Sequence, residues 1–167
     1  MSSGYLLNPY WLGQNPQPQP YGSFTSTQSQ QVSGANVTTV MTYNNTEVAS
    51  QIYNNGAKIY VQATGVYRVL ATVQFDTTSG GQQRVTFWFR KNGTNIANSA
   101  STFTIQNNGE NVGECEIFVS LLAGDYVEVV MQSPDVNMSA SYTAPSGTVP
   151  NAIPAVPSII TVIQKIA

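Results

Sequence analysis

The sequence predicts an all-β protein, folded as an antiparallel two-sheet jelly-roll sandwich of about 8–10 strands and preceded by an extended arm. Apolar residues alternate with polar ones over many short segments, which is the period of a half-buried strand, and no segment has the helical period. Pairs of Asn, Gly and Ser separate these segments at short intervals, as turns between antiparallel strands do. With 167 residues, the chain suits a single folded domain.

Residues 1–22 predict an extended, proline-rich arm outside the sandwich. Prolines in the run NPQPQPY fix φ and remove backbone donors, which favours a polyproline-like conformation. Aromatic and aliphatic side chains flank this run and make the arm too apolar for a free linker. We therefore expect the arm to pack on a neighbouring protein; the alternative is that it folds back on its own domain. The expected contact residues are Tyr5, Leu6, Leu7, Tyr10, Trp11, Leu12, Pro16, Pro18, Pro20 and Tyr21.

Residues 23–167 contain the predicted jelly-roll domain. In residues 64–76, five apolar side chains from Tyr67 to Phe75 occupy alternate positions and predict a strand with one buried face. Residues 84–93 repeat this pattern and end in Asn-Gly, which predicts a tight turn because both residue types tolerate positive φ. Further β-rich runs cover residues 37–43, 57–63, 101–106, 114–122, 125–133 and 157–166.

Turns and one long loop divide the runs. We expect Asp125 to cap the Gly-Asp turn, because its short carboxylate can accept hydrogen bonds from the local backbone. The interval from Pro134 to Pro157 carries five prolines and predicts a loop that leaves the sandwich before the last strand. The remaining turn signals lie at residues 54–56, 79–81, 107–109 and 123–125.

Charge is scarce, and its scarcity excludes several classes of partner. Only 8% of residues are charged and the net charge is −2. Six basic residues cannot form a phosphate track, so we expect no nucleic acid; we expect Arg90 and Lys91 to meet an acid on a neighbouring subunit. No segment approaches the roughly 18 apolar residues of a membrane span. The composition fits either a secreted β-protein with a neutral surface or a subunit packed among copies of itself.

Catalytic and metal chemistry lack their usual residues. The chain has no His and a single Cys, Cys115, which excludes a His-paired nucleophile and a zinc site. Glu114 and Glu116 flank Cys115 and offer calcium ligands or an acid ring, although a solvated strand face is the simpler interpretation. We therefore expect no enzyme activity, no cofactor and no bound metal.

Four motifs resemble a known superfamily, the jelly rolls shared by tumour necrosis factor and the globular heads of complement. TGVYRV (64–69) resembles its Gly-x-Tyr strand entry, LLAGDYVEVVM (121–131) its Gly-Asp hairpin and PSIITVIQKI (157–166) its closing strand. FWFRKNGTNIANS (87–99) is similar to the version in phage and large-virus structural proteins. The N-terminus lacks the basic region of a signal peptide, and the chain lacks a stalk and a disulfide, which favours the viral branch.

The resemblance implies a homotrimer packed around a threefold axis. Tyr60, Trp88 and Tyr126 lie opposite to, or outside, the clearest core-facing sets. They are candidates to pack between subunits, since such interfaces are enriched in aromatic side chains. The alternative is that they cap the ends of the sandwich.

These observations favour a virion structural protein, a bacteriophage decoration or cement protein that is folded in the host cytoplasm. We expect homotrimers on the capsid surface, with the arm bound to the major capsid protein or another virion protein. One alternative is a trimeric fibre or spike head that binds a host receptor or glycan through the loop at 134–157. A second is a soluble trimeric binding module unrelated to a virus.

Overall fold

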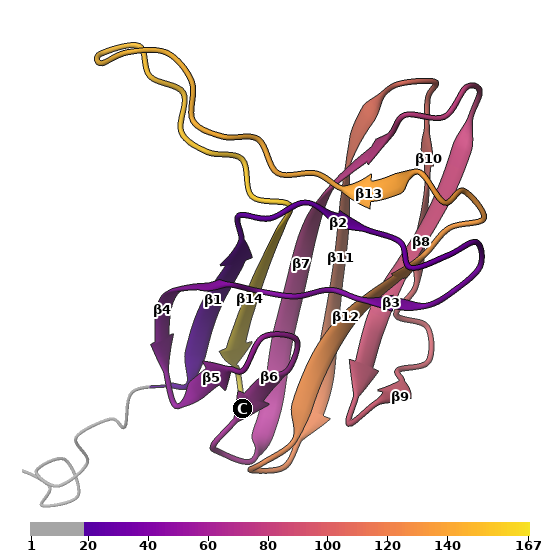
Figure 1. The fold of residues 1–167 in the computed structure, drawn as a ribbon. Helices are drawn as coiled ribbons and strands as arrows, with labels where there is room; N and C mark the ends of the chain where they lie inside the picture. Colours follow the sequence, from indigo (N-terminus) through magenta and orange to yellow (C-terminus); the bar gives the residue numbers. More distant parts are fainter. Residues whose placement is uncertain (1–18) are drawn as a thin grey trace, which may run out of the picture.

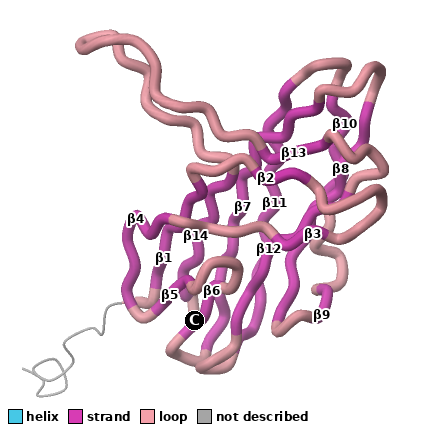
Figure 2. The backbone as a smooth tube through the Cα atoms, viewed as in Figure 1, coloured by secondary structure: helices cyan, strands magenta, loops and turns pink. Residues whose placement is uncertain are grey.

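Residues 19–167 are described by the computed structural model, and they form two antiparallel sheets stacked as a sandwich (Figures 1 and 2). The described residues contain no helix that could cross a membrane. The first sheet, sheet A, contains β1 (Tyr21–Ser26), β2 (Gln30–Gln31), β4 (Asn45–Ser50), β7 (Gly65–Thr77), β11 (Glu110–Leu121), β13 (Met138–Ala140) and β14 (Ile159–Lys165). The second, sheet B, contains β3 (Thr39–Val40), β5 (Ile52–Asn54), β6 (Ile59–Val61), β8 (Gln83–Lys91), β9 (Thr94–Asn95), β10 (Ser101–Ile105) and β12 (Tyr126–Gln132).

The all-β jelly-roll prediction is confirmed. Within residues 19–167, eight strands have five residues or more, and the other six have two or three. The expected boundary of the arm at residue 22 falls inside β1, which begins at Tyr21. Strand β1 and the exposed edge strand β4 were not predicted, because their polar residues interrupt the alternation of apolar and polar residues that marks a half-buried strand.

Strand β7 organises sheet A. It pairs with β11 from Gly65 to Asp76 on one side and with β14 and β13 on the other, all antiparallel. Its alternate side chains from Tyr67 to Phe75 are fully buried, as predicted. Phe75 contacts Phe87 of sheet B at 5.6 Å between ring centroids, and Phe103 lies within 6.2 Å of both. The core is therefore a layer of aromatic and aliphatic side chains between the two sheets.

Gly113 on β11 makes room for this aromatic group. A Cβ atom at position 113 would lie 2.6 Å from Phe75 Cε2 and 3.1 Å from Phe87 Cε1. Real Cβ atoms do not approach so closely, so the two rings require a glycine at this point of the strand.

The two ends of the sandwich differ in structure (Figure 1). Chain entry lies at one end, where Tyr21 pairs with Gln164 beside the C-terminus. At the other end a long excursion, residues 141–158, projects from the body, and we call it the ribbon. Its base is tied to Gln74 by hydrogen bonds from Ser141 N and to Ser158 O. Gln74 lies six positions after Arg68, the partner of Gln164, along β7, which places the two ends about 20 Å apart.

The ribbon is the excursion loop that the prolines predicted, with more order than expected. Two isolated antiparallel bridges, Thr143 with Val156 and Ser146 with Ile153, hold its two sides together. The predicted interval also contains strand β13, which pairs with β7. Val149 at the tip is 88% exposed. The segment from Val136 to Gln164 carries no charged side chain, so the ribbon presents an uncharged surface.

Candidate interaction surfaces

The outward side of sheet A carries apolar residues on three of four neighbouring strands, β4, β14 and β7, with Ser23 of β1 between them. Val48, Ser23, Val162 and Leu70 lie in register on β4, β1, β14 and β7, and Ile160 follows Val162 on the same side. Val48 is 50% exposed and Val162 38%. We call this surface, together with Phe118 on β11, the sheet A face.

Phe118 extends the sheet A face onto β11. It is 62% exposed although it lies in the middle of a twelve-residue strand, directly opposite Arg68. Exposed aromatic side chains on a flat sheet are typical of a surface that contacts another protein. This face could not be predicted from the sequence, because its members are far apart along the chain.

One ion pair lies within the sheet A face. Arg68 donates from Nε to Glu116 Oε1 at 2.7 Å and from a terminal nitrogen to Oε2 at 2.8 Å. These hydrogen bonds raise the pKa of Arg68 and lower the pKa of Glu116 from their ordinary values. The pair neutralises two of the few charges on this face and fixes both side chains in a planar geometry.

A ladder of three tyrosines crosses the outward side of sheet B. Tyr53 on β5, Tyr60 on β6 and Tyr126 on β12 are directly opposite one another. The rings of Tyr53 and Tyr60 stack with centroids 5.0 Å apart and planes 8° from parallel, and Tyr60 and Tyr126 are 5.2 Å apart. Lys58 Nζ lies 4.5 Å from the centroid of the Tyr126 ring. We call Tyr53, Tyr60 and Tyr126 the tyrosine ladder.

The structure brings together two of the three aromatics that the sequence singled out. Tyr60 and Tyr126 meet in the ladder, whereas Trp88 lies further along β8, opposite Val130, and donates from Nε1 to Asn95 Oδ1 at 2.8 Å. Tyr53 was missed. The repeated Ile-Tyr pair at 52–53 and 59–60 was the available signal, since the two segments form one hairpin.

Most of the predicted arm contacts lie outside the described residues. These are Tyr5, Leu6, Leu7, Tyr10, Trp11, Leu12, Pro16 and Pro18. Pro20 and Tyr21 are described, and both belong to the sandwich. Pro20 is buried and its carbonyl accepts the Lys165 amide at 2.8 Å, while Tyr21 is a half-exposed residue of β1.

The two turns at the end of the sandwich are joined by side chains. Asp125 accepts the Leu122 amide at 2.8 Å, so it caps the Gly-Asp turn as predicted, and it also accepts Asn92 Nδ2 at 2.7 Å. Lys91 Nζ lies 2.9 Å from the same carboxylate. The predicted contact of Lys91 with an acid on a neighbouring subunit is therefore corrected, because its acid is on its own chain. Arg90 donates from Nε to Asn95 Oδ1 at 2.9 Å.

The acids beside Cys115 do not form a metal site within the described residues. Glu116 is committed to Arg68, and no group of three or more His, Cys, Asp or Glu that could hold a metal occurs in residues 19–167. Cys115 points toward the core, where its Sγ lies 3.1 Å from the Ser99 carbonyl oxygen.

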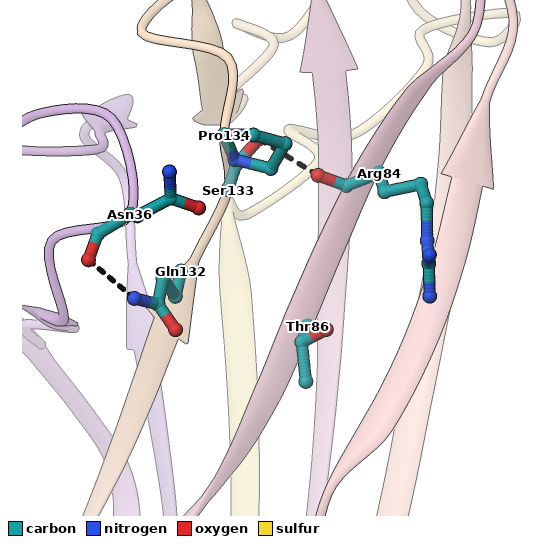
Figure 3. A pocket seen from close by; sticks show the side chains of 6 residues that line it. All are labelled: Asn36, Arg84, Thr86, Gln132, Ser133 and Pro134. Atoms are coloured by element: carbon teal, nitrogen blue, oxygen red, sulfur yellow. Dashed lines mark hydrogen bonds between the residues drawn. The ribbon is translucent and has the colours of Figure 1, made fainter.

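A polar hollow of about 230 Å³ lies beside the end of β12 (Figure 3). Ser133 Oγ donates to the Arg84 carbonyl at 2.7 Å, and Gln132 Nε2 donates to the Asn36 carbonyl. The guanidinium of Arg84 points away from the other lining side chains. These contacts tie β8, β12 and the segment before β3 together, and they leave no convergent set of reactive groups in the hollow.

Solved structures with the same fold include three of murine APRIL, a jelly-roll protein of the tumour-necrosis-factor family. At pH 5.0 the TM-score is 0.57 with 10% identity, over 89% of this chain and 99% of that one. For the structure at pH 8.0 the TM-score is 0.52 with 14% identity, over 89% of this chain and 99% of that one. For the structure at pH 8.5 the TM-score is 0.50 with 14% identity, over 87% of this chain and 98% of that one. No protein-family model and no curated protein sequence matches the chain. At such identities, the likeness shows the jelly-roll fold alone.

Proposed function

We propose that this protein is a non-enzymatic structural component of a virus particle, a bacteriophage decoration or cement protein that forms homotrimers on the capsid. The observation that carries the proposal is the sheet A face, a broad apolar surface on a chain with 8% charged residues. Monomeric soluble proteins rarely expose a contiguous apolar surface of this kind. Its weak charge also lets copies approach closely.

We propose that copies of the chain contact one another through the sheet A face. Val48, Val162 and Phe118 supply the apolar area, and the Arg68–Glu116 pair supplies polar contacts that suit the centre or rim of an interface. Tyr60, Trp88 and Tyr126 were the first candidates for this role. They are half-buried within their own domain, whereas Val48, Val162 and Phe118 of the sheet A face are exposed.

Anchoring to the shell is assigned to the distal arm, where Tyr5 to Leu12 provide the apolar side chains. Burial of about 400 Å² of apolar surface there is worth about 10 kcal/mol before the costs of ordering are subtracted. Many arms on one particle would add avidity. Pro20 and Tyr21 are part of the sandwich, so the anchoring role is proposed only for residues that precede them.

Deletion of residues 2–18 tests the proposal. The full-length and shortened proteins are each incubated with shells of the particle that lacks this protein, and bound protein is counted by electron microscopy. We expect the full-length protein to decorate the shells and the shortened protein to remain free while keeping its fold. Normal decoration by the shortened protein would overturn the anchoring role, and absence of the full-length protein from any particle would overturn the function.

The ribbon favours a second candidate, a fibre or spike head. It projects at the end of the sandwich opposite to chain entry, so a protein anchored by its arm would present Val149 and its neighbours outward (Figure 1). Under this alternative, removal of residues 144–154 abolishes adsorption to host cells and leaves particle stability unchanged. Under the cement function, the same deletion leaves adsorption unchanged.

A further inference from the structure

The tyrosine ladder presents an aromatic surface beside the point where the chain enters the sandwich. Tyr53 is 48% exposed, and its ring stacks on Tyr60, so its outer side is open to solvent. Lys58 lies against the Tyr126 ring. Within residues 19–167, the hydroxyls of Tyr53 and Tyr60 make no hydrogen bond. The ladder thus offers aromatic faces and free hydroxyl donors.

The chain enters close to this ladder. Tyr21 pairs with Ser50 at the end of β4. Ser50 is three residues from Tyr53, which is at most about 10 Å, because the chain bends at Gln51. Gly22 packs beside β5, since a Cβ atom there would lie 3.4 Å from Ile52 Cγ2. β5 is the edge strand of sheet B, so a chain leaving β1 backward can pass around that edge onto the ladder (Figure 1).

Residues 14–18, Gln-Asn-Pro-Gln-Pro, have the chemistry and the length to cover the ladder. In the polyproline conformation, at about 3.1 Å per residue, a segment at these positions would reach about 9–22 Å from Tyr21, which is far enough to cover Tyr53. Proline-rich segments bind aromatic-lined surfaces because their stiff chain loses little entropy and their carbonyls are free to accept hydrogen bonds. Residues 1–18 carry no charged side chain. This suits the tyrosine ladder, where the Lys58 ammonium group already lies against the Tyr126 ring.

We propose that residues 14–18 pack across the tyrosine ladder of their own domain, with the proline rings against Tyr53 and Tyr60. Alternate prolines repeat about every 6 Å in this conformation, close to the 5.0 Å and 5.2 Å between the ladder's ring centroids. The ladder then fixes the direction in which residues 1–13 leave the domain. This goes beyond the function proposed above, because it concerns the isolated protein and holds whatever the distal arm binds.

Paramagnetic broadening in the full-length protein tests the proposal. A nitroxide is attached at Gln17→Cys in a Cys115→Ser background, and amide signals are compared with those of the reduced label. We expect strong broadening in β5 and β6 and none at the ribbon tip around Val149. A mixture of isotope-labelled protein without nitroxide and unlabelled protein with it should show no broadening, because the contact is within one chain.

Two sets of variants decide the outcome. Pro16→Ala with Pro18→Ala changes the proposed occupant, and Tyr53→Ser with Tyr60→Ser removes two rings of the ladder. Each should abolish the broadening of β5 and β6, whereas Tyr142→Ser, at the base of the ribbon, should leave it unchanged. The proposal is overturned by broadening confined to the sheet A face or to the mixed sample, by uniform weak broadening, or by full broadening in the proline variant. No shell is used, so failure here is distinct from failure of the cement function.

Discussion

Asn92 and Asp125 join two turns that are distant in the sequence, through a hydrogen bond of 2.7 Å from Asn92 Nδ2 to Asp125 Oδ1. Asn92 also accepts the Tyr126 amide at 3.0 Å, and Asp125 accepts the Leu122 amide. With Lys91 at 2.9 Å, these contacts lower the pKa of Asp125 to about 2. The Asp125 carboxylate therefore links the two turns at the end of the sandwich beside chain entry.

Asp125→Asn should lower the free energy of unfolding at neutral pH by about 1–3 kcal/mol, because the variant loses charge-assisted acceptor contacts. Asp125 has a folded pKa near 2 and an ordinary value of 3.8, so its stabilisation is complete above that ordinary value. It is lost as the pH falls from about 4 to about 2. Urea unfolding of the wild type and of Asp125→Asn should show that the difference between their free energies of unfolding becomes smaller over this pH range.

The control for Asp125→Asn is Asn107→Ala. Asn107 is an exposed turn residue whose side chain makes no hydrogen bond within residues 19–167, so its replacement should change the free energy of unfolding little. Asn92→Ala should resemble Asp125→Asn and add backbone strain, since Asn92 has φ of 50°. A constant difference between wild type and Asp125→Asn from pH 7 to pH 2 would contradict the assigned role of the carboxylate.

Tyr43 and Thr161 form a buried polar pair, with their hydroxyl oxygens 2.7 Å apart. Tyr43→Phe should cost about 1–3 kcal/mol of stability, because the buried Thr161 hydroxyl loses its partner. Addition of Thr161→Val should recover part of the loss, and the double-mutant cycle measures the coupling. Burial also raises the pKa of Tyr43, so its phenol should ionise later than exposed tyrosines in an alkaline absorbance titration.

Gly113→Ala should destabilise the domain by about 1–3 kcal/mol, because the new methyl group would overlap the Phe75 ring. Gly80→Ala is the matched control, since a Cβ atom there meets nothing within 4 Å and its φ is not positive. Thermal unfolding monitored by circular dichroism compares them. Equal melting temperatures for the two variants would contradict the packing described around Phe75.

The sequence predicted those parts of the fold in which one side of a strand is buried and the other is not. Strand β7 is the clearest case, since its residues from Tyr67 to Phe75 alternate between core and surface. Strand β4 escaped prediction because five of its six residues are exposed and nothing apolar alternates. Strand β1 escaped because Gly22 and Ser26 occupy inward positions that Val or Ile would otherwise mark.

The candidate surfaces were less predictable, because they depend on register between distant strands. Val162 and Leu70 are 92 positions apart in the printed sequence, and only the pairing of β14 with β7 makes them neighbours. Two of the three ladder tyrosines, Tyr60 and Tyr126, were singled out from the sequence as candidates for contact between subunits, and their contact with each other was not predicted. Tyr53 could be added only from the β5–β6 register. The pairing of Lys91 with Asp125 was also not predictable, because it depends on contact between the turn after β8 and the turn before β12.

Sedimentation equilibrium on the purified protein tests most directly whether the chain works as a self-associated subunit. The chain mass is 18.0 kDa, so a trimer has three times that mass, about 54 kDa. We expect the trimer mass for the wild type and for Val149→Glu at the ribbon tip, and the single-chain mass for Val162→Glu, which places a charge on the sheet A face. A wild-type protein that stays at 18.0 kDa at every accessible concentration would contradict the account.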